Sequence, residues 1–400
     1  MNIFKKIFYR TFQKVMHILI PFFPYREPIL LDEFIGVIDV IKNVHKIQNV
    51  MIVTDKTIRK LGLTSTLEKL FKENNIIYTI YDGTVPNPTS DNVEEAKTLY
   101  LENECMGIVA IGGGSVIDCA KALGAQISKP NKSLNKMEGL IKIRKRIPLL
   151  IAVPTTAGSG SETTVASVIV DSKTHHKYVI NDFCLIPMYA VMAPSVTIGL
   201  PKHVTSTTGM DALTHAIEAY IGNSRTKKSK KAAIEAVKLI FENLEKAYIN
   251  GNDLVARKNM LYAAYLAGTA FTKSYVGYVH AVAHTLGGKY GVAHGLANAV
   301  LLPHTLRAYG KRITKKLAQL AKVIGFIEVD VSDEDAAELF ISHIEKMNEN
   351  MLIPTKLDCV NKDDISGLAK LADKEANPLY PVPVLWDNKE LEKLYLSICK

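Results

Sequence analysis

Short apolar runs alternate with amphipathic stretches through much of the first half of the chain. Strands are predicted at residues 50–54, 76–81, 107–111 and 149–153. Helices are predicted between them, at residues 57–73, 94–103 and 116–126. Buried strands that alternate with helices are typical of a parallel sheet covered on both faces. This half of the chain therefore predicts a doubly wound α/β fold.

One segment of this half departs from the alternation. Residues 166–170 and 177–180 are two short β-type runs on either side of a turn-forming stretch that begins Asp171-Ser172-Lys173. Two such runs around a polar turn indicate an antiparallel hairpin.

The pattern changes after about Pro201, where long helical periodicities dominate. Helices are predicted at residues 212–220, 228–249, 254–272, 304–323, 334–348 and 388–397. A chain of 400 residues exceeds the usual span of one core, so two domains are expected. We therefore predict an α/β domain at 31–198 and an all-helical domain at 199–400, preceded by an arm at 1–30.

Composition narrows the functional classes. The 48% hydrophobic and 22% charged residues fit a globular enzyme, and no apolar run reaches the roughly 18–20 residues of a membrane helix. The net charge of +9 is dispersed along the chain, with no nucleic-acid-binding module. Five cysteines form no Cys-x-x-Cys pair, which argues against a thiolate zinc site and a disulfide framework. A reducing, cytoplasmic compartment is expected.

The arm at residues 1–30 is a basic amphipathic helix by pattern. Apolar residues recur at helical spacing between Ile3 and Leu19, lysines and an arginine separate them, and no acidic residue precedes Glu27. Two interpretations fit: an arm that packs on the body or on a second subunit, and a helix whose residues 1–20 lie peripherally on the inner membrane surface. A cleaved secretory signal fits poorly because prolines interrupt the apolar stretch. An organellar transit peptide remains a third alternative.

Five metal-capable side chains stand at tight spacing in the second half. Asp211 and His215 are four residues apart, as are His280 and His284, and His294 follows ten residues later. Residues at i and i+4 share one face of a helix, so each pair can point at a common centre. One carboxylate and several imidazoles suit Zn²⁺ or Fe²⁺. The alternative is that these are unrelated histidines of the core. That interpretation is unlikely for the whole set, because four of the five side chains form two i, i+4 pairs.

Two glycine-rich loops follow predicted strands in the first half. Gly112-Gly113-Gly114-Ser115 lies between a strand and a helix, where bare backbone and a helix N-terminus suit a phosphate. The hydroxyl-rich loop 154–162 follows the next strand and suits phosphate or ribose. Asp55 ends the first strand, where a carboxylate can accept hydrogen bonds from ribose hydroxyls and favours NAD over NADP. The alternative for the first loop is a plain turn, and the alternative for loop 154–162 is a flexible lid. The alternative for Asp55 is a helix N-cap.

Taken in order, these pieces resemble the iron-containing (group III) alcohol dehydrogenases, in particular lactaldehyde and propanediol oxidoreductases. The resemblance covers about residues 48–398. It is strongest at Ile52 to Lys56, Tyr81 to Pro88, Gly112 to Lys121, Pro154 to Glu162, Gly209 to Tyr220 and His280 to His304. It implies the dehydroquinate synthase-like fold of that family, an α/β nucleotide-binding domain plus a helical domain, with the site in the cleft.

The resemblance also implies roles for individual residues. The metal ligands would be Asp211, His215, His280 and His294, and the family tilts the metal toward Fe²⁺ with Zn²⁺ as the alternative. His284 would lie beside the nicotinamide and is the candidate catalytic residue that relays a proton. The residues expected around the cofactor are Asp55, Asn87, Gly113, Gly114, Ser115, Thr155, Thr156, Thr164, Lys177 and His294. Thr164, Val165, Phe271 and Trp386 are candidates for the substrate pocket.

The expected reaction is reversible hydride transfer between a primary or short-chain alcohol or diol and NAD. The cation would act as a Lewis acid on the substrate oxygen. A polyol or glycerol dehydrogenase and a maleylacetate reductase are alternatives on the same fold. A membrane-associated or filamentous scaffold without turnover is a remote one. A small alcohol or aldehyde substrate and a homodimer or higher homo-oligomer are the expected partners, with no nucleic acid.

Overall fold

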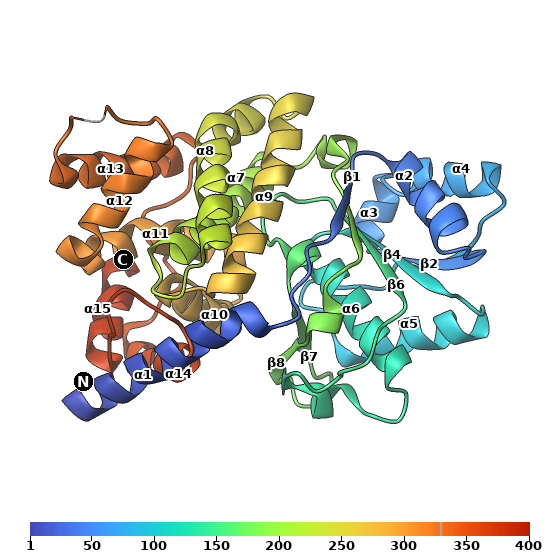
Figure 1. Ribbon diagram of the computed structural model, residues 1–400, viewed down its shortest axis with the longest axis horizontal. Helices are drawn as coiled ribbons and strands as arrows, with labels where there is room; N and C mark the ends of the chain where they lie inside the picture. Colours follow the sequence, from blue (N-terminus) through green and yellow to red (C-terminus); the bar gives the residue numbers. More distant parts are fainter. Residues whose placement is uncertain (329) are drawn as a thin grey trace. The chain divides into compact units, whose positions relative to one another are not determined.

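The computed structural model describes residues 1–328 and 330–400 and divides the chain into two units (Figure 1). One unit comprises residues 24–198, and the other comprises residues 1–23 together with 199–400. The arm at the start of the chain thus belongs with the helical unit, and the α/β unit is inserted between the two parts of that unit.

The α/β unit is built on a six-stranded parallel sheet in the order β1-β9-β6-β4-β2-β3. Its strands are β1 (Ile29–Leu31), β2 (Asn49–Val53), β3 (Ile77–Tyr81), β4 (Gly107–Gly112), β6 (Leu149–Pro154) and β9 (Tyr189–Val191). The helices of this unit are α2 (Phe34–Asp39), α3 (Lys56–Lys60), α4 (Ser65–Glu73), α5 (Ser90–Glu102) and α6 (Gly114–Ser128). The predicted parallel α/β fold is confirmed.

Alternate residues of each central strand enter two different cores. Met51 and Ile108 pack with α5 and α6 on one face of the sheet. Val50 and Val109 pack with α2, α3 and α4 on the other. Because side chains alternate across a strand, a strand buried on both faces must be apolar at every position, which explains the continuous runs in the sequence.

A second, three-stranded sheet has the order β5-β8-β7. Its strands are β5 (Gly139–Leu140), β7 (Ala166–Val170) and β8 (Lys177–Asn181), and β7 and β8 form the predicted antiparallel hairpin. The turn is closed by the Asp171 side chain, which accepts from the backbone N–H groups of Lys173 and Thr174.

The larger part of the helical unit follows Ile198, and its first helix is α7. Its helices are α7 (Lys202–Ile221), α8 (Lys227–Ile249), α9 (Leu254–Ser274), α10 (Tyr278–Tyr290), α11 (His294–Tyr309), α12 (Thr314–Val323), α13 (Asp333–Asn350), α14 (Ile365–Ala376) and α15 (Asn388–Ile398). The arm adds helix α1 (Ile3–Leu19). Within the described residues, no helix combines the length and hydropathy needed to cross a bilayer.

Three predicted elements were wrong in extent. The helix predicted at 57–73 is broken into α3 and α4 at Gly62, whose φ of +70° is unfavourable for other residues. The helix predicted at 304–323 is two helices, because α11 ends at Tyr309 and Gly310 has a φ of +52°. The helix predicted at 212–220 begins ten residues earlier, at Lys202.

Candidate metal and nucleotide sites

Helix α7 carries two of the expected metal ligands at its buried centre. It is buried at every residue from 209 to 221, so its polar side chains must find partners inside the helical unit. Asp211 and His215 are each 4% exposed and lie one turn apart. Gly209 lets α8 approach, because a Cβ there would stand 2.2 Å from the Leu244 side chain.

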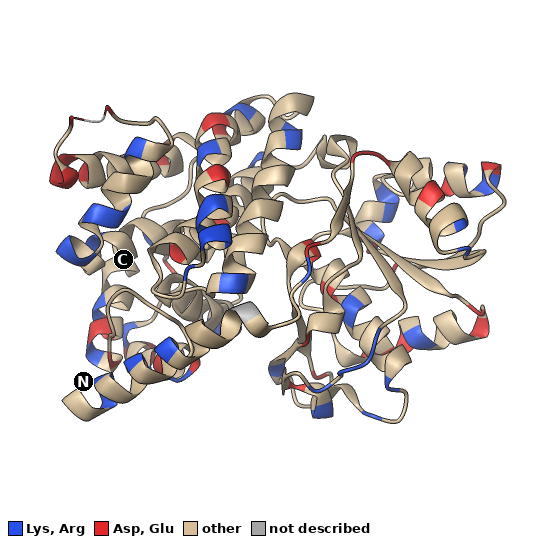
Figure 2. Cartoon of the chain, in the orientation of Figure 1, with Lys and Arg blue, Asp and Glu red and all other residues tan. Residues whose placement is uncertain are grey.

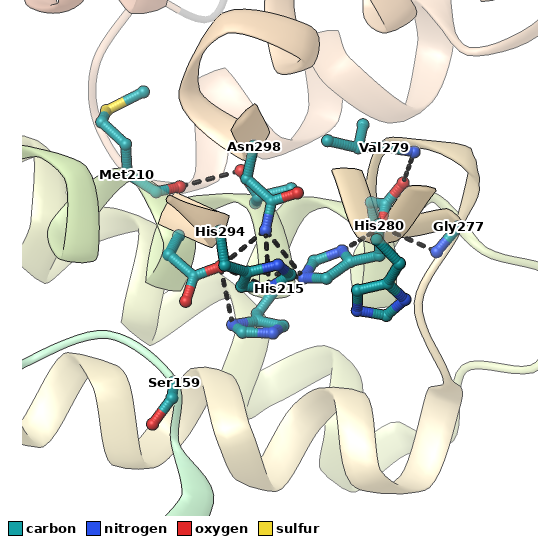
Figure 3. Close-up of polar contacts among 12 residues, drawn as sticks. Ser159, Met210, His215, Gly277, Val279, His280, His294 and Asn298 are labelled. Atoms are coloured by element: carbon teal, nitrogen blue, oxygen red, sulfur yellow. Dashed lines mark hydrogen bonds and ion pairs between the residues drawn. The ribbon is translucent and has the colours of Figure 1, made fainter. Parts of the chain in front are cut away.

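Helices α10 and α11 bring two further imidazoles to the same point. The Asp211 carboxylate lies 3.8 Å from Nε2 of His280 and 3.5 Å from Nε2 of His294. It lies 4.0 Å from Nδ1 of His215. Figure 3 shows the three imidazoles gathered around one point, and all four donor atoms lie within 4.8 Å of one another. The structure thus brings together the four side chains expected to bind metal.

The donor set fits a divalent cation. Donors that share one ion at about 2.1 Å stand at most about 4.2 Å apart, which matches the separations from Asp211. Nδ1 of His215 is buried and has no hydrogen-bond partner among the described residues. One carboxylate and three imidazoles without a thiolate suit Fe²⁺ or Zn²⁺. His294 is the most accessible of the four, with 41% of its side chain exposed.

The protonation states also suit a metal. Burial, opposed by the Asp211 carboxylate, lowers the pKa of His215, His280 and His294 to about 3, so their lone pairs are free near pH 7. For Asp211, burial opposes ionisation, but the three histidines and the Asn298 amide outweigh it and lower the pKa. The cluster therefore presents one anion and three neutral imidazoles.

Glu218, which the sequence reasoning missed, fixes the orientation of His280. Its carboxylate accepts from Nδ1 of His280 at 2.7 Å and from the backbone N–H groups of Gly277 at 2.7 Å and Val279 at 2.9 Å. With the proton held on Nδ1, the Nε2 lone pair of His280 faces Asp211. Burial raises the pKa of Glu218 to about 7, against those backbone donors. Its spacing of three from His215 was the available signal.

Asn298 is a second residue that the sequence reasoning missed. Its Nδ2 donates to Asp211 at 2.6 Å and lies 3.2 Å from Nε2 of His280 and 3.1 Å from Nε2 of His294. The side chain is fully buried, one turn after His294 on α11. Asn298 thus touches three of the four donors and holds the Asp211 carboxylate in place.

His284 lies on α10 next to this cluster but outside the set of four. Its ring centre is 5.1 Å from that of His294, and its Nδ1 is 2.6 Å from Oε1 of Glu375. The His284 side chain is 42% exposed. It therefore differs from the four clustered side chains in its partner, and it is as accessible as His294.

Two of the pocket candidates separate clearly. Phe271 stacks on His215, with ring centres 4.1 Å apart and planes 15° apart. Trp386 is instead buried in a stack with Tyr278 and Tyr309, at 5.0 Å and 4.5 Å between ring centres. Trp386 therefore contributes to the packing of the helical unit, and its place in a substrate pocket stays a prediction.

The α/β unit holds the residues expected at the nucleotide. Its strand order reverses between β2 and β4, and ligands of open α/β sheets bind at the carboxyl ends of strands at such a point. Gly113 is the N-cap of α6 and follows β4 directly. A Cβ on Gly114 would stand 2.9 Å from Oγ of Ser159, and Thr155 N–H donates to the Gly112 carbonyl at 3.0 Å. The two loops therefore pack tightly on each other.

Asn87 joins three parts of this region. Its backbone N–H donates to Oγ of Ser115 at 3.4 Å, and its Oδ1 accepts from Nζ of Lys177 at 2.7 Å. Its φ of +56° turns the chain after β3. Thr156 lies at the start of α6, with its Oγ1 3.4 Å from the position of a Cβ on Gly113. Asn87, Ser115, Thr156 and Lys177 are thus brought to the start of α6.

Asp55 and Thr164 complete the expected set. Asp55 is the N-cap of α3 and accepts from the Ile58 N–H at 2.9 Å. Thr164 is held by Lys121, a residue that the sequence reasoning missed, whose Nζ donates to its hydroxyl at 2.8 Å and its carbonyl at 3.0 Å. Burial lowers the pKa of Lys121 to about 8, against the attraction of Asp118 and Glu162. This buried lysine anchors the loop that contains Thr155 and Thr156.

Comparison with known proteins identifies the family. Two family models match: iron-containing alcohol dehydrogenase over residues 35–194, and the C-terminal part of the same family over residues 205–399. A 1,3-propanediol dehydrogenase of Citrobacter freundii is 38% identical over 86% of this chain and 90% of that protein. An NAD-dependent methanol dehydrogenase of Bacillus methanolicus is 37% identical over 80% of this chain and 85% of that protein.

Solved structures agree with the sequence comparison. The crystal structure of a 1,3-propanediol oxidoreductase has a TM-score of 0.89 and 35% identity, over 94% of this chain and 99% of that one. An alcohol dehydrogenase from Oenococcus oeni has a TM-score of 0.88 and 32% identity, over 94% of this chain and all of that one. The resemblance drawn from the sequence is confirmed: this chain belongs to the iron-containing alcohol dehydrogenase family.

Proposed function

We propose that this enzyme reversibly oxidises a small primary alcohol or diol with NAD. The single observation that carries the proposal is the convergence of Asp211, His215, His280 and His294 on one point. The names of the relatives, 1,3-propanediol dehydrogenase and NAD-dependent methanol dehydrogenase, support a short alcohol and NAD. We assign Fe²⁺ to the cluster, with Zn²⁺ as the alternative.

The four clustered side chains are the proposed metal ligands. A bound divalent cation supplies Lewis-acid chemistry at the substrate oxygen. Asp211 contributes the one negative charge of the set, and Glu218 holds His280 in the tautomer that points Nε2 inward. Phe271 stacks on His215 and keeps its ring in one plane. These residues orient the site before substrate arrives.

His284 is the proposed proton relay. Glu375 accepts from its Nδ1 at 2.6 Å and so favours the tautomer with the lone pair on Nε2, which would take up the alcohol proton and pass it to solvent. The exposed edge of the ring gives that proton a way out. His284 is thus proposed to act on the proton, while the four-residue cluster acts on the oxygen.

The α/β unit is the proposed NAD site. We place the pyrophosphate at the N-terminus of α6, where Gly113, Gly114 and Ser115 leave backbone N–H groups accessible. We assign Asn87, Thr155, Thr156, Thr164 and Lys177 to the remaining cofactor contacts, and His294 to a contact from the metal centre. Asp55 would accept from the ribose hydroxyls, and its charge disfavours the added phosphate of NADP.

The decisive experiment combines a substrate panel with metal removal. NADH formation is measured with 1,3-propanediol, methanol and glycerol on anaerobically purified enzyme, before and after chelation. His280→Ala is expected to lose the metal and turnover while retaining the fold by circular dichroism. The matched control is His304→Ala, whose ring contacts the Thr355 carbonyl at 3.1 Å, away from the four clustered side chains. Full activity in His280→Ala would refute the assignment.

We further propose a cytoplasmic, homo-oligomeric enzyme with a peripheral membrane contact. All five cysteines are free thiols, in keeping with a reducing compartment. Within the described residues, strand β1 forms the edge of the sheet, pairs with β9 and exposes Ile29 and Leu30, which suits pairing with another copy. The apolar side chains exposed on α1 suggest the membrane contact. Sedimentation velocity measures the assembly.

A further inference from the structure

Helix α1 is held to the helical unit by polar contacts. Gln13 is 4% exposed and donates from Nε2 to the Tyr380 carbonyl at 2.7 Å and the Pro378 carbonyl at 3.2 Å. Arg10 donates to the carbonyls of Val382 at 2.7 Å and Pro383 at 2.9 Å. These four bonds lie on one side of the helix, so they fix which side of α1 faces solvent.

The opposite side of α1 is apolar and exposed. Its side chains recur at the helical period and continue one turn beyond the helix. They are Ile3, Phe4, Ile7, Phe8, Val15, Ile18, Leu19 and Phe22, each between 42% and 79% exposed. An amphipathic helix that served only to pack on the body would turn this stripe inward. Contiguous exposed apolar surface of this kind marks an interaction site.

The charged side chains that α1 itself carries are all positive, and Asp373 and Asp387 of the helical unit lie near Lys5. Lys5, Lys6 and Lys14 are exposed, and no Asp or Glu occurs before Glu27. Figure 2 shows basic positions along helix α1. The helical period places Lys5 at one border of the stripe and Lys14 at the other. Lysines at such borders can lay their stems on apolar surface and keep the charge at an interface. A second copy of α1 on the stripe would bring like charges together, whereas anionic lipid would neutralise them.

We propose that α1 is an interfacial helix that seats the enzyme on an anionic membrane surface. Ile3, Phe4, Ile7, Phe8 and their neighbours along the stripe enter the boundary between headgroups and acyl chains, and the lysines bind lipid phosphates. The helical unit holds α1 from behind through Arg10 and Gln13, so the helix lies in the membrane plane. The inference deepens the peripheral contact proposed above and does not depend on dehydrogenase activity.

Cosedimentation of the full-length protein with vesicles tests this assignment. One set of vesicles contains phosphatidylcholine alone, and the other contains phosphatidylcholine with phosphatidylglycerol. The protein is expected to bind the second set at least tenfold more strongly, with the preference lost at high salt. Phe4→Glu/Phe8→Glu is expected to reduce binding at least tenfold. Lys5→Gln/Lys14→Gln is expected to reduce it about fivefold per lysine.

A matched control places the same two charges on other exposed apolar residues of the helical unit. Ile249 and Val255 are 72% and 70% exposed, and Ile249→Glu/Val255→Glu is expected to bind vesicles as the wild type does. Equal loss in this control, or no binding of the wild type to either vesicle set, overturns the proposal. A third outcome would also overturn it: the wild type does not bind vesicles but forms a concentration-dependent oligomer, and Phe4→Glu/Phe8→Glu dissociates that oligomer. The stripe would then be an interface between two copies of the chain.

Activity without vesicles separates this proposal from the proposed function. All these variants are expected to form NADH from 1,3-propanediol at the wild-type rate, since none touches the metal cluster or the nucleotide loops. A protein that binds anionic vesicles but oxidises no alcohol contradicts only the dehydrogenase assignment. An active enzyme that ignores vesicles contradicts only the membrane assignment.

Discussion

Replacement of Glu218 by glutamine tests whether the buried carboxylate behind His280 tunes the metal site. Glu218 accepts three hydrogen bonds, from Nδ1 of His280 and from the N–H groups of Gly277 and Val279. A glutamine amide has one acceptor oxygen, and its NH₂ group would face donors. The substitution keeps the shape of the side chain, but the donors from His280, Gly277 and Val279 no longer face an ionised acceptor.

The expected effect can be worked out from these contacts. Loss of a carboxylate that orients a ligating histidine typically weakens metal binding by about 10–100-fold, or about 1.4–2.7 kcal/mol. A glutamine loses at least one of the three hydrogen bonds, and each bond to an ionised group contributes about 1.5–3 kcal/mol. The metal-free protein should therefore also lose about 3 kcal/mol of stability above pH 7, where Glu218 is ionised. The two effects are measured separately, the first by metal affinity and the second by unfolding of the metal-free protein.

The assay is competition for Zn²⁺ between the metal-free enzyme and a chromophoric chelator. Glu375→Gln is the matched control, because Glu375 makes an equivalent contact, at 2.6 Å, to Nδ1 of His284 outside the set of four. It is expected to retain wild-type affinity. Unchanged affinity in Glu218→Gln, or an equal decrease in both variants, would refute the reasoning.

Three further predictions concern other parts of the molecule. In Gly113→Ala, the added Cβ meets Thr156 at an ordinary contact distance of 3.4 Å, so the stability of the protein should not change. The affinity for NAD, measured by fluorescence titration, should fall at least tenfold, and an unchanged affinity would exclude a phosphate at this position. Burial raises the pKa of Glu162 from 4.5 to about 7, so its contribution to stability is complete below pH 4.5 and is lost as the pH rises through 7. Glu162→Gln should abolish this pH-dependent loss of stability, which is on the order of 3 kcal/mol, when urea unfolding is measured between pH 4.5 and pH 7. If the free energy of unfolding of the variant still falls with pH over this range, the assignment is wrong. His284→Gln should lower kcat about 10²-fold and remove a pH limb from its profile while metal content stays constant; a kcat profile like that of the wild type excludes the relay.

The central strands of the sheet could be predicted because the hydrophobic pattern that marks each strand lies within its own sequence. Strands such as β4, buried on both faces, must be apolar throughout, and that run is visible without any neighbour. The three-residue strands β1 and β9 went unseen, because they are defined by pairing with each other and with β6. Gly62 and Gly310 ended helices that apolar periodicity alone would have continued.

The metal cluster was predictable for a similar reason. Asp211 and His215 share a helix face by spacing alone, and a polar pair in an apolar helix needs a partner. The residues that orient these side chains were harder to predict, because their contacts join different helices. Glu218 accepts a hydrogen bond from His280 of another helix, and Asn298 donates one to Asp211 of another helix. Lys121 looked like an ordinary lysine, and only the fold shows it buried among the carbonyls of a loop some forty residues later.

The division of the chain has a consequence for biosynthesis. Gln13 leaves the ribosome early, whereas the carbonyls of Pro378 and Tyr380 that hold it are made near the end. At about 5–20 residues per second, the arm waits roughly 20–70 s for its docking site. During that interval the α/β domain can fold independently, while the nascent arm offers its aromatic and aliphatic groups to chaperones, or to a bilayer, before the enzyme is complete.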